Sequence, residues 1–241
     1  REAMSEAVGL ANELNGWNRT ASAVVRTMVE AAENGLFGDR GRSMRFLKAV
    51  LQDHPEWDGA YYTYEPDADG RDAASLEALR RGREGALPAE ALDDQGRFIP
   101  YFFRDNARQR QIALKRITDD MTNQYYQGPK RAFADGQPDR VELTEPYSYE
   151  GVLMTECTMA ITANGRFAGI AGIDRGLASM QQRLQAIAER TKLNVMLLTA
   201  RNRFVVGAVG DPMDDGTLAR AYESLKARPV QDTPWKGTLP A

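Results

Sequence analysis

The chain has 241 residues, a formal net charge of −3 and 42% apolar residues, values that are typical of a globular protein and exclude a disordered one. It contains one histidine, His54, and one cysteine, Cys157. One of each cannot form a zinc cluster or an intrachain disulfide, so we expect no metal site and no cofactor. The mild acidity, without a basic stripe, argues against nucleic acid as a partner.

The ends of the chain indicate a segment of a longer protein. No run approaches the ~18 consecutive apolar residues that a membrane helix needs. The sequence begins with Arg1 rather than Met and shows no signal peptide. We therefore interpret it as an excised piece and expect membrane spans in the parts that flank it.

The first part of the chain is predicted to be mainly helical. Apolar residues recur every three or four positions over 2–33, and Asn34-Gly35 follows as a stop signal. At about 1.5 Å per residue such a helix is roughly 45 Å long, enough to run along two stacked modules. The alternative is a long surface helix of a single domain. A second helix is predicted over 43–52, with Ser43 as its N-cap.

Two aromatic runs in the next part of the chain predict strands. The first is 57–64 (WDGAYYTY), and a charged helical segment at 72–84 follows it. The second is 98–103 (FIPYFF). Since proline has no N–H to donate, Pro100 restricts this second strand to the edge of a sheet or to a strand start.

A β-hairpin is predicted in the second half of the chain. Two apolar segments, 151–162 and 167–173, flank Asn164-Gly165. Asn-Gly between such segments is the strongest short-range signal for a hairpin, because both residues tolerate the positive φ angles of its turn.

The remaining residues repeat this organisation on a smaller scale. We predict a helix over 177–191, a second hairpin-like pair at 195–200 and 203–209, and a final helix over 217–227. Two hairpins separated by one helix suggest two related antiparallel modules in tandem.

The segment from Asn123 to Asp174 resembles the double Cache family, which comprises tandem PAS-like sensing domains outside bacterial membranes. The resemblance rests on an ordered set of short motifs rather than on any one of them. These are Tyr125-Tyr126, Glu145-Pro146-Tyr147, Met154-Thr155 and Gly165-x-x-x-Gly169-Ile170-x-x-x-Asp174.

The resemblance implies an α+β fold, with a long N-terminal helix and two tandem PAS-like antiparallel-sheet modules. We expect the helix over 1–40, a membrane-distal ligand-binding module over 41–177, and a connecting helix with a membrane-proximal module over 178–241. The protein would be the periplasmic part of an inner-membrane receptor, of the chemoreceptor or sensor histidine kinase type.

The resemblance also directs attention to the ligand. The amino-acid-binding branch of the family holds the ligand's carboxylate with an Arg-x-Trp-Tyr motif and its ammonium with two acids. Here Asn123 and Tyr125 stand where the Arg and Trp would be, although Tyr126 is kept. Tyr149 replaces the first acid, and only Asp174 matches. An amino acid is therefore a doubtful ligand.

The chemistry of the candidate ligand residues favours a small carboxylate, such as a short organic acid. Tyrosine hydroxyls on apolar rings fix small polar solutes, and an arginine or lysine pairs with an anion. The candidates are Tyr101, Phe103, Arg104, Tyr125, Tyr126, Lys130, Tyr147, Tyr149 and Asp174.

Structural alternatives exist for each type of candidate. The tyrosines are equally well explained as core residues. Arg104 precedes Asp105 and fits an exposed ion pair, and Lys130 fits a solvated position. Asp174 fits the cap of a helix that starts near Gly176.

Three functions compete. The first is a non-catalytic sensor domain that signals by a conformational change, with the N-terminal helix available for homodimer packing. The second is an enzyme, which would depend on His54, with Asp53 or Asp58, or on Cys157 as a nucleophile. The third is an interaction module without a small ligand. The resemblance favours the sensor.

Overall fold

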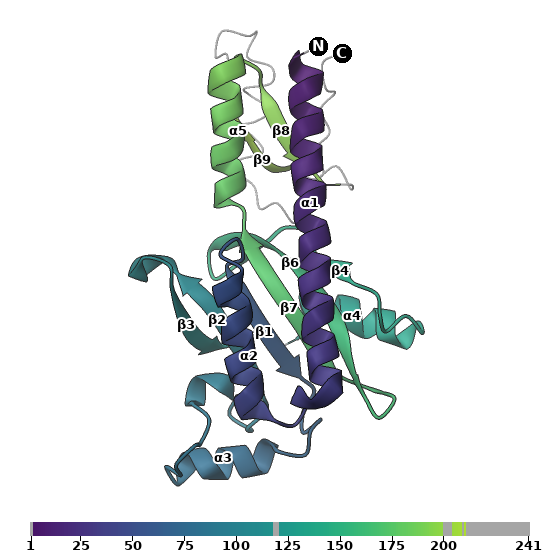
Figure 1. Cartoon of the computed structure of the whole chain (residues 1–241), viewed down its shortest axis with the longest axis vertical. Helices are drawn as coiled ribbons and strands as arrows, with labels where there is room; N and C mark the ends of the chain where they lie inside the picture. Colours follow the sequence, from purple (N-terminus) through teal and green to yellow (C-terminus); the bar gives the residue numbers. More distant parts are fainter. Residues whose placement is uncertain (1, 118–120, 200–203, 209, 211–241) are drawn as a thin grey trace. The chain divides into compact units, whose positions relative to one another are not determined.

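The computed structural model of the chain describes residues 2–117, 121–199, 204–208 and 210 (Figure 1). The chain divides into two compact units. The larger unit comprises Trp17–Thr144 and Glu156–Arg175. The smaller unit comprises the described residues of 1–16, 145–155 and 176–241. The module boundaries expected from the sequence, at 40/41 and 177/178, stay predictions.

The long N-terminal helix is present as predicted. Helix α1 spans Glu2–Ala31, and a π-helical turn over Ala32–Leu36 ends it. Within this turn Gly35 has a φ of 129°, a conformation that only glycine adopts readily. Helix α2 spans Arg40–Asp53 and begins earlier than predicted.

The N-cap of α2 is Asp39, and the assignment of this role to Ser43 was wrong. The side chain of Asp39 accepts a hydrogen bond from the backbone N–H of Arg42. Ser43 lies inside the first turn and is fully buried, and its hydroxyl donates to the carbonyl of Leu36 at 3.0 Å. Aspartate and serine both cap helices, and the sequence did not show at which of the two residues the helix begins.

In the described residues, seven strands form one sheet in the order β3-β2-β1-β7-β6-β4, with β5 also paired to β6. The neighbours of β1 on both sides run antiparallel to it. The strands are β1 (Gly59–Tyr64), β2 (Pro100–Asp105), β3 (Gln111–Arg116), β4 (Glu142–Leu143), β5 (Tyr147–Tyr149), β6 (Val152–Ala163) and β7 (Arg166–Gly176).

Pro100 is the first residue of β2, as one of the two predicted alternatives had it. The edge-strand alternative was wrong, since β2 lies between β1 and β3. Proline is tolerated there because the first position of a strand need not donate to the ladder.

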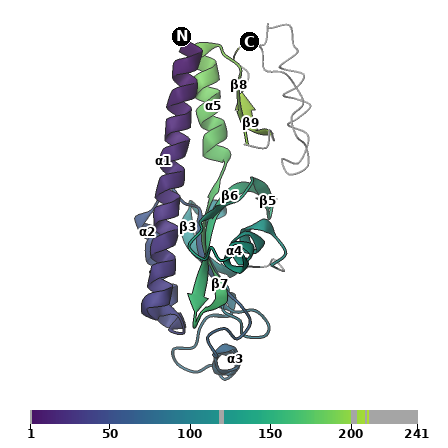
Figure 2. The same cartoon turned by 90° about the vertical axis from the view of Figure 1, so that its right-hand side faces the viewer.

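Helices cover both faces of the sheet. Helices α1 and α2 pack on one face and α4 (Gln124–Ala134) lies on the other (Figure 2). Side chains of β1 alternate between the two faces. Tyr62 and Tyr64 point toward α1 and α2 and join the main hydrophobic core, where the Tyr62 hydroxyl donates to the carbonyl of Met28 at 2.6 Å.

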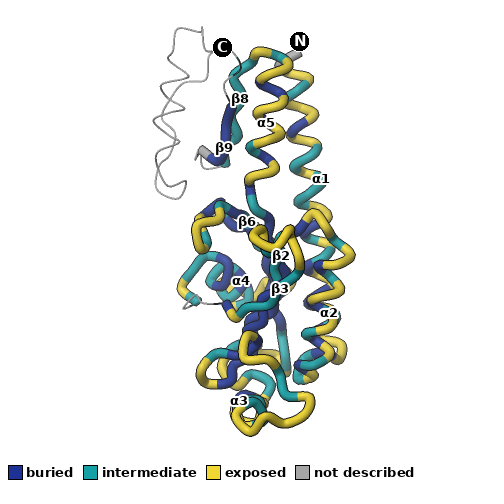
Figure 3. The backbone as a smooth tube through the Cα atoms, turned by 90° about the vertical axis from the view of Figure 1, so that its left-hand side faces the viewer, coloured by how far each residue is buried: buried dark blue, intermediate teal, exposed yellow. Residues whose placement is uncertain are grey.

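The β6–β7 hairpin forms at Asn164-Gly165, as predicted. The two residues have φ angles of 50° and 71°, which is the positive-φ pair of a type I′ turn. The predicted strands 151–162 and 167–173 correspond to β6 and β7. Figure 3 shows that the interior of this sheet is buried, whereas the outward side of α1 is exposed.

A buried ion network holds the segment between β1 and β2. The guanidinium of Arg40, which is 4% exposed, contacts the carboxylates of Asp69 at 2.6 Å and Asp72 at 2.5 Å. It also donates to the carbonyl of Gly96 at 2.8 Å. Helix α3 (Asp72–Arg80) starts at this network, so the network fixes the course of the long connection.

The smaller unit contains α5 (Ala178–Thr191) and a two-stranded sheet of β8 (Val195–Leu198) and β9 (Phe204–Ala208). The side chain of Gln181 on α5 donates to the carbonyl of Gly207 at 2.6 Å and accepts from its N–H at 3.3 Å. Strands β8 and β9 pair antiparallel, which confirms the second predicted pair of strands. The predicted helix at 217–227 lies outside the described residues.

Within the described part of the chain, no helix combines the length and the apolar character that crossing a membrane requires.

Candidate functional site

The α4 side of the sheet carries an unusual concentration of buried polar side chains. On β1 and β2, Tyr61 and Tyr101 are cross-strand partners, and their rings meet edge to face at 5.8 Å. Asp174 on β7 and Glu156 on β6 are buried carboxyl groups of the same unit. The hydrophobic core lies on the opposite face, and burying polar groups is costly. Their presence on the α4 side therefore indicates a role other than core packing.

Asp174 is a deeply buried acid, with 1% exposure. Burial raises the pKa of its carboxyl to about 7, the nearby Tyr101 and Lys115 lower it, and Asp58 raises it. Its cross-strand partner is Gly59. A Cβ at that position would lie 2.2 Å from Oδ2 of Asp174 and 2.8 Å from the Tyr101 hydroxyl, so glycine is required to leave these groups room.

Glu156 is 6% exposed and accepts a 3.1 Å hydrogen bond from the Tyr61 hydroxyl. Its backbone is fixed to Thr144 in both directions, since each residue donates its N–H to an oxygen of the other at 2.9 Å. The carboxylate is therefore held at a defined place beside Tyr61.

Helix α4 supplies the aromatic cover of this face. Asn123 caps the helix by accepting from the N–H of Gln124. Tyr125 is 2% exposed, and its ring meets that of Tyr61 edge to face at 5.9 Å. Tyr126 is fully buried, and its hydroxyl donates to Glu65. Burial and Glu65 raise the pKa of this phenol.

The predicted cations lie in different surroundings. The ammonium of Lys130 forms a 3.0 Å ion pair with Glu65 and stands 5.4 Å from the ring centre of Phe167. A cation that the sequence did not single out, Lys115 on β3, lies 5.2 Å from the ring centre of Tyr101 and 4.6 Å from that of Phe103.

Arg104 lies away from this group. Because side chains alternate along β2, Tyr101 and Phe103 point to the α4 side and Arg104 points to the other. Its guanidinium donates to the backbone carbonyls of Trp57, at 2.9 Å, and of Leu51. It therefore ties the end of α2 to the sheet, and the predicted pair with Asp105 is replaced by a structural role.

Tyr147 and Tyr149 lie in the smaller unit, on β5, opposite Met154 and Val152 of β6. Tyr147 is 2% exposed and Tyr149 is partly exposed. The structure therefore brings together Tyr101, Phe103, Tyr125, Tyr126, Lys130 and Asp174 in the larger unit.

The capping alternative for Asp174 does not hold. Helix α5 starts at Ala178, and the residue at its N-cap position is Leu177. Asp174 instead lies within β7, where its own carbonyl accepts from the N–H of Asp58.

Sequence reasoning missed Tyr61, Lys115 and Glu156. A signal for Glu156 was present, since an ionisable residue interrupts the apolar stretch GVLMTECTMAIT. Tyr61 carried no distinguishing signal, because three tyrosines lie within 61–64. Only the strand register shows which face of the sheet each one occupies.

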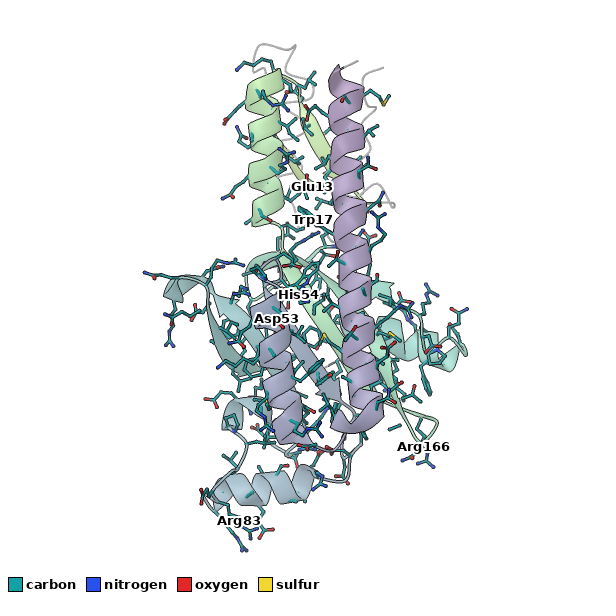
Figure 4. The ribbon with its side chains drawn as sticks, viewed as in Figure 1. Glu13, Trp17, Asp53, His54, Arg83 and Arg166 are labelled. Atoms are coloured by element: carbon teal, nitrogen blue, oxygen red, sulfur yellow. The ribbon has the colours of Figure 1, made fainter. Side chains whose placement is uncertain are left out.

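The two residues considered for catalysis, His54 and Cys157, lie in surroundings that are explained by the fold. Asp53 and His54 lie at the C-terminal end of α2 (Figure 4), and Nδ1 of His54 is 3.1 Å from a carboxylate oxygen of Glu56. Cys157 is 3% exposed in the hydrophobic core, and burial raises the pKa of its thiol to about 12. Across the described residues, no group of three or more His, Cys, Asp or Glu side chains is placed to hold a metal.

Comparison with known proteins gives a consistent result. The model of a family described as "methyl-accepting chemotaxis protein-like, first PDC sensor domain" matches residues 44–182. The extracellular domain of mmHK1S-Z2, which is assigned as a histidine kinase, is 25% identical with a TM-score of 0.66. That match covers 92% of this chain and 82% of the other.

Two further solved structures share the fold. Methyl-accepting chemotaxis protein X is 22% identical with a TM-score of 0.68, over 98% of this chain and 86% of the other. The ligand-binding domain of the chemoreceptor PctC from Pseudomonas aeruginosa PAO1, solved with GABA, is 12% identical with a TM-score of 0.53. The match covers 94% and 82% of the two chains. A search of curated proteins returned no match.

Proposed function

Because the chain belongs to the family of methyl-accepting chemotaxis protein-like first PDC sensor domains, we propose that it binds a small solute on the α4 side of the large sheet and signals through a conformational change. The predicted relationship to Cache-type sensors and the predicted α+β fold are both confirmed. The function is thus that of a sensor domain of the chemoreceptor or histidine kinase type.

The observation that carries the proposed site is the buried carboxyl of Asp174 under the tyrosines of two strands and a helix. Burying a carboxyl group to 1% exposure costs stability unless hydrogen bonds or an opposite charge stabilise it. A bound ligand can supply such contacts. Tyr61, Tyr101 and Tyr125 place aromatic rings and hydroxyls around the same region. Such a combination is typical of sites for small polar molecules.

We retain a small carboxylate as the ligand class. We also propose where the domain lies in the whole receptor and how two copies associate. The ligand-binding domain of PctC, which shares the fold, was solved in complex with GABA, a small molecule that carries a carboxylate. The domain is proposed to be periplasmic, with membrane spans in flanking parts of the protein. A homodimer through α1 is proposed as well, since Met4 and Val8 on this helix are 70% and 51% exposed.

Thermal denaturation with small solutes tests the proposed site. We would screen short organic acids, amino acids and amines at millimolar concentration. The wild-type chain should show a higher melting temperature with at least one of them. Tyr101→Phe and Asp174→Asn should reduce that shift.

Tyr62→Phe is the matched control, because Tyr62 neighbours Tyr61 but faces α1 and donates to the carbonyl of Met28. It should keep the ligand-induced shift at a lower baseline stability. Equal loss in all three variants, or no solute that shifts the wild type, would contradict the proposed site.

A further inference from the structure

Arg97 is a buried arginine outside every predicted site. It precedes β2 and is 6% exposed. Its backbone is fixed to Asp93, because its N–H donates to the side chain at 2.9 Å and its carbonyl accepts from the Asp93 N–H at 3.0 Å. Nε of the side chain donates to the carbonyl of Tyr64. The guanidinium therefore has a defined position.

The charge of Arg97 is not neutralised by an ion pair in the part of the chain that the structure describes. Its Nη2 is buried and has no hydrogen-bond partner there. Arg40 shows the contrast, because that equally buried guanidinium contacts two carboxylates, those of Asp69 and Asp72. A buried guanidinium with an unpartnered N–H group and no ion pair is costly, so the Nη2 of Arg97 is suited to bind an anion from elsewhere.

The surroundings of Arg97 belong to the proposed site. Its guanidinium carbon stands 5.9 Å from the ring centre of Tyr126. The nearby carboxylate of Glu65 already accepts from the Tyr126 hydroxyl and from Lys130. Two cations and one carboxylate leave this end of the site with an excess of positive charge. Tyr125 connects Tyr126 at this end of the site to Tyr61, because its ring meets both of theirs edge to face.

We propose that Arg97 is the specificity-determining cation of the sensor, whose free Nη2 binds the carboxylate of a small organic acid beside Tyr126. The inference rests on the proposed function and names the residue that selects the ligand class. It replaces Arg104, whose guanidinium is engaged by backbone carbonyls on the opposite face. Charge-assisted hydrogen bonds in a buried site are strong enough to discriminate a carboxylate from its neutral amide.

The test compares acids with their amides on the 241-residue chain. Acetate, propionate, pyruvate and succinate are titrated by calorimetry, together with the amide of each acid. The wild type should bind at least one acid and should bind its amide at least tenfold more weakly. Arg97→Gln should lose at least tenfold in affinity for the acid, and Arg97→Lys should keep part of it because the charge remains.

Arg104→Gln is the matched control, since it removes a guanidinium of the same strand region that donates to backbone carbonyls. It should lower the melting temperature and leave acid binding unchanged. Circular dichroism and the melting temperature of each variant without ligand show that it folds. If Arg97→Gln does not fold, Arg97→Lys decides the outcome. Because this variant keeps the charge but lacks Nη2, an acid affinity equal to that of the wild type contradicts the proposal.

The outcomes separate this inference from the proposed function. Unchanged acid binding in folded Arg97→Gln would overturn the role of Arg97 alone. Binding of amines or neutral solutes but of no acid, with loss in Asp174→Asn, would also overturn it and leave the sensor site intact. Absence of binding by every solute would overturn both.

Discussion

The Tyr61 hydroxyl on β1 donates to Glu156 on β6 across the intervening strand β7. This reach is possible because the residue of β7 opposite Tyr61 is Gly172. A Cβ there would lie 2.2 Å from the phenol carbon Cζ of Tyr61. The glycine thus allows one tyrosine to span three strands within the proposed site.

Substitution Gly172→Ala is expected to displace Tyr61 and break its bond to Glu156. Inserting a methyl group into a tightly packed region typically costs about 1–3 kcal/mol. Urea denaturation should show this loss, and ligand binding should weaken with it. Gly9→Ala on α1 is the control, because nothing lies within 4 Å of its Cβ position and alanine favours a helix by up to about 1 kcal/mol. A Gly172→Ala variant as stable as Gly9→Ala would contradict the close contact.

Asp174 is expected to make the stability of the protein depend on pH. Its pKa is about 7 in the folded chain, because burial disfavours the carboxylate, and about 3.9 when unfolded. Between pH 4 and 7 the folded state therefore binds the extra proton, and the free energy of unfolding falls as the pH rises. The cost reaches about 4 kcal/mol above pH 7.

Asp174→Asn removes this titration and should be more stable than the wild type at pH 8. Urea denaturation at pH 4 to 8 measures the effect. The variant should show a flatter profile over this range, and a profile parallel to that of the wild type would assign the pH dependence to other groups.

Arg40→Leu is expected to destabilise the protein strongly. It leaves the carboxylates of Asp69 and Asp72 in a buried region without their cation, and breaking such a pair typically costs about 3–5 kcal/mol. Arg42→Ala removes an exposed arginine two residues later, whose pair with Asp39 is 3.9 Å long, and should cost less than about 1 kcal/mol. Similar melting temperatures for the two variants would contradict the network.

Cys157→Ala and His54→Ala are expected to leave ligand binding unchanged. The Cys157 thiol, with a pKa near 12, carries almost no thiolate at pH 8, so iodoacetamide should label it only after unfolding. The alanine variant should lose about 1 kcal/mol through the small cavity. Rapid labelling of the folded chain, or loss of binding in either variant, would reopen a role for these residues in chemistry.

The sequence allowed the long helix, the β6–β7 hairpin and α5 to be predicted because each has a strong local signal. Helix α1 has a clear three-to-four periodicity, and Asn164-Gly165 fits one turn type. Strand β3 and helix α4 were missed. The sequence QIALKR of β3 is half charged or polar, and α4 contains Gly128 and Pro129, which normally indicate a break.

The candidate site was predicted in part, because its members depend on faces rather than on residue types. Family resemblance singled out Tyr126, Tyr147 and Asp174, of which Tyr147 lies in the smaller unit. The alternation along β2 decided that Tyr101 lies in the site and Arg104 outside it. Arg97 could not be recognised from the sequence, since an arginine near Asp93 and Asp94 predicts an ordinary exposed pair.

The alternation along β1 also bears on how this sensor evolves. Tyr61 serves the ligand side and Tyr62 serves the core, although the two side chains are identical. Insertion or deletion of one residue before them would exchange their faces, so that core and binding side would be lost together. Ligand preference should therefore diversify by substitution within the strands, while changes of length accumulate in the connection between β1 and β2, as in its segment Arg81–Pro88.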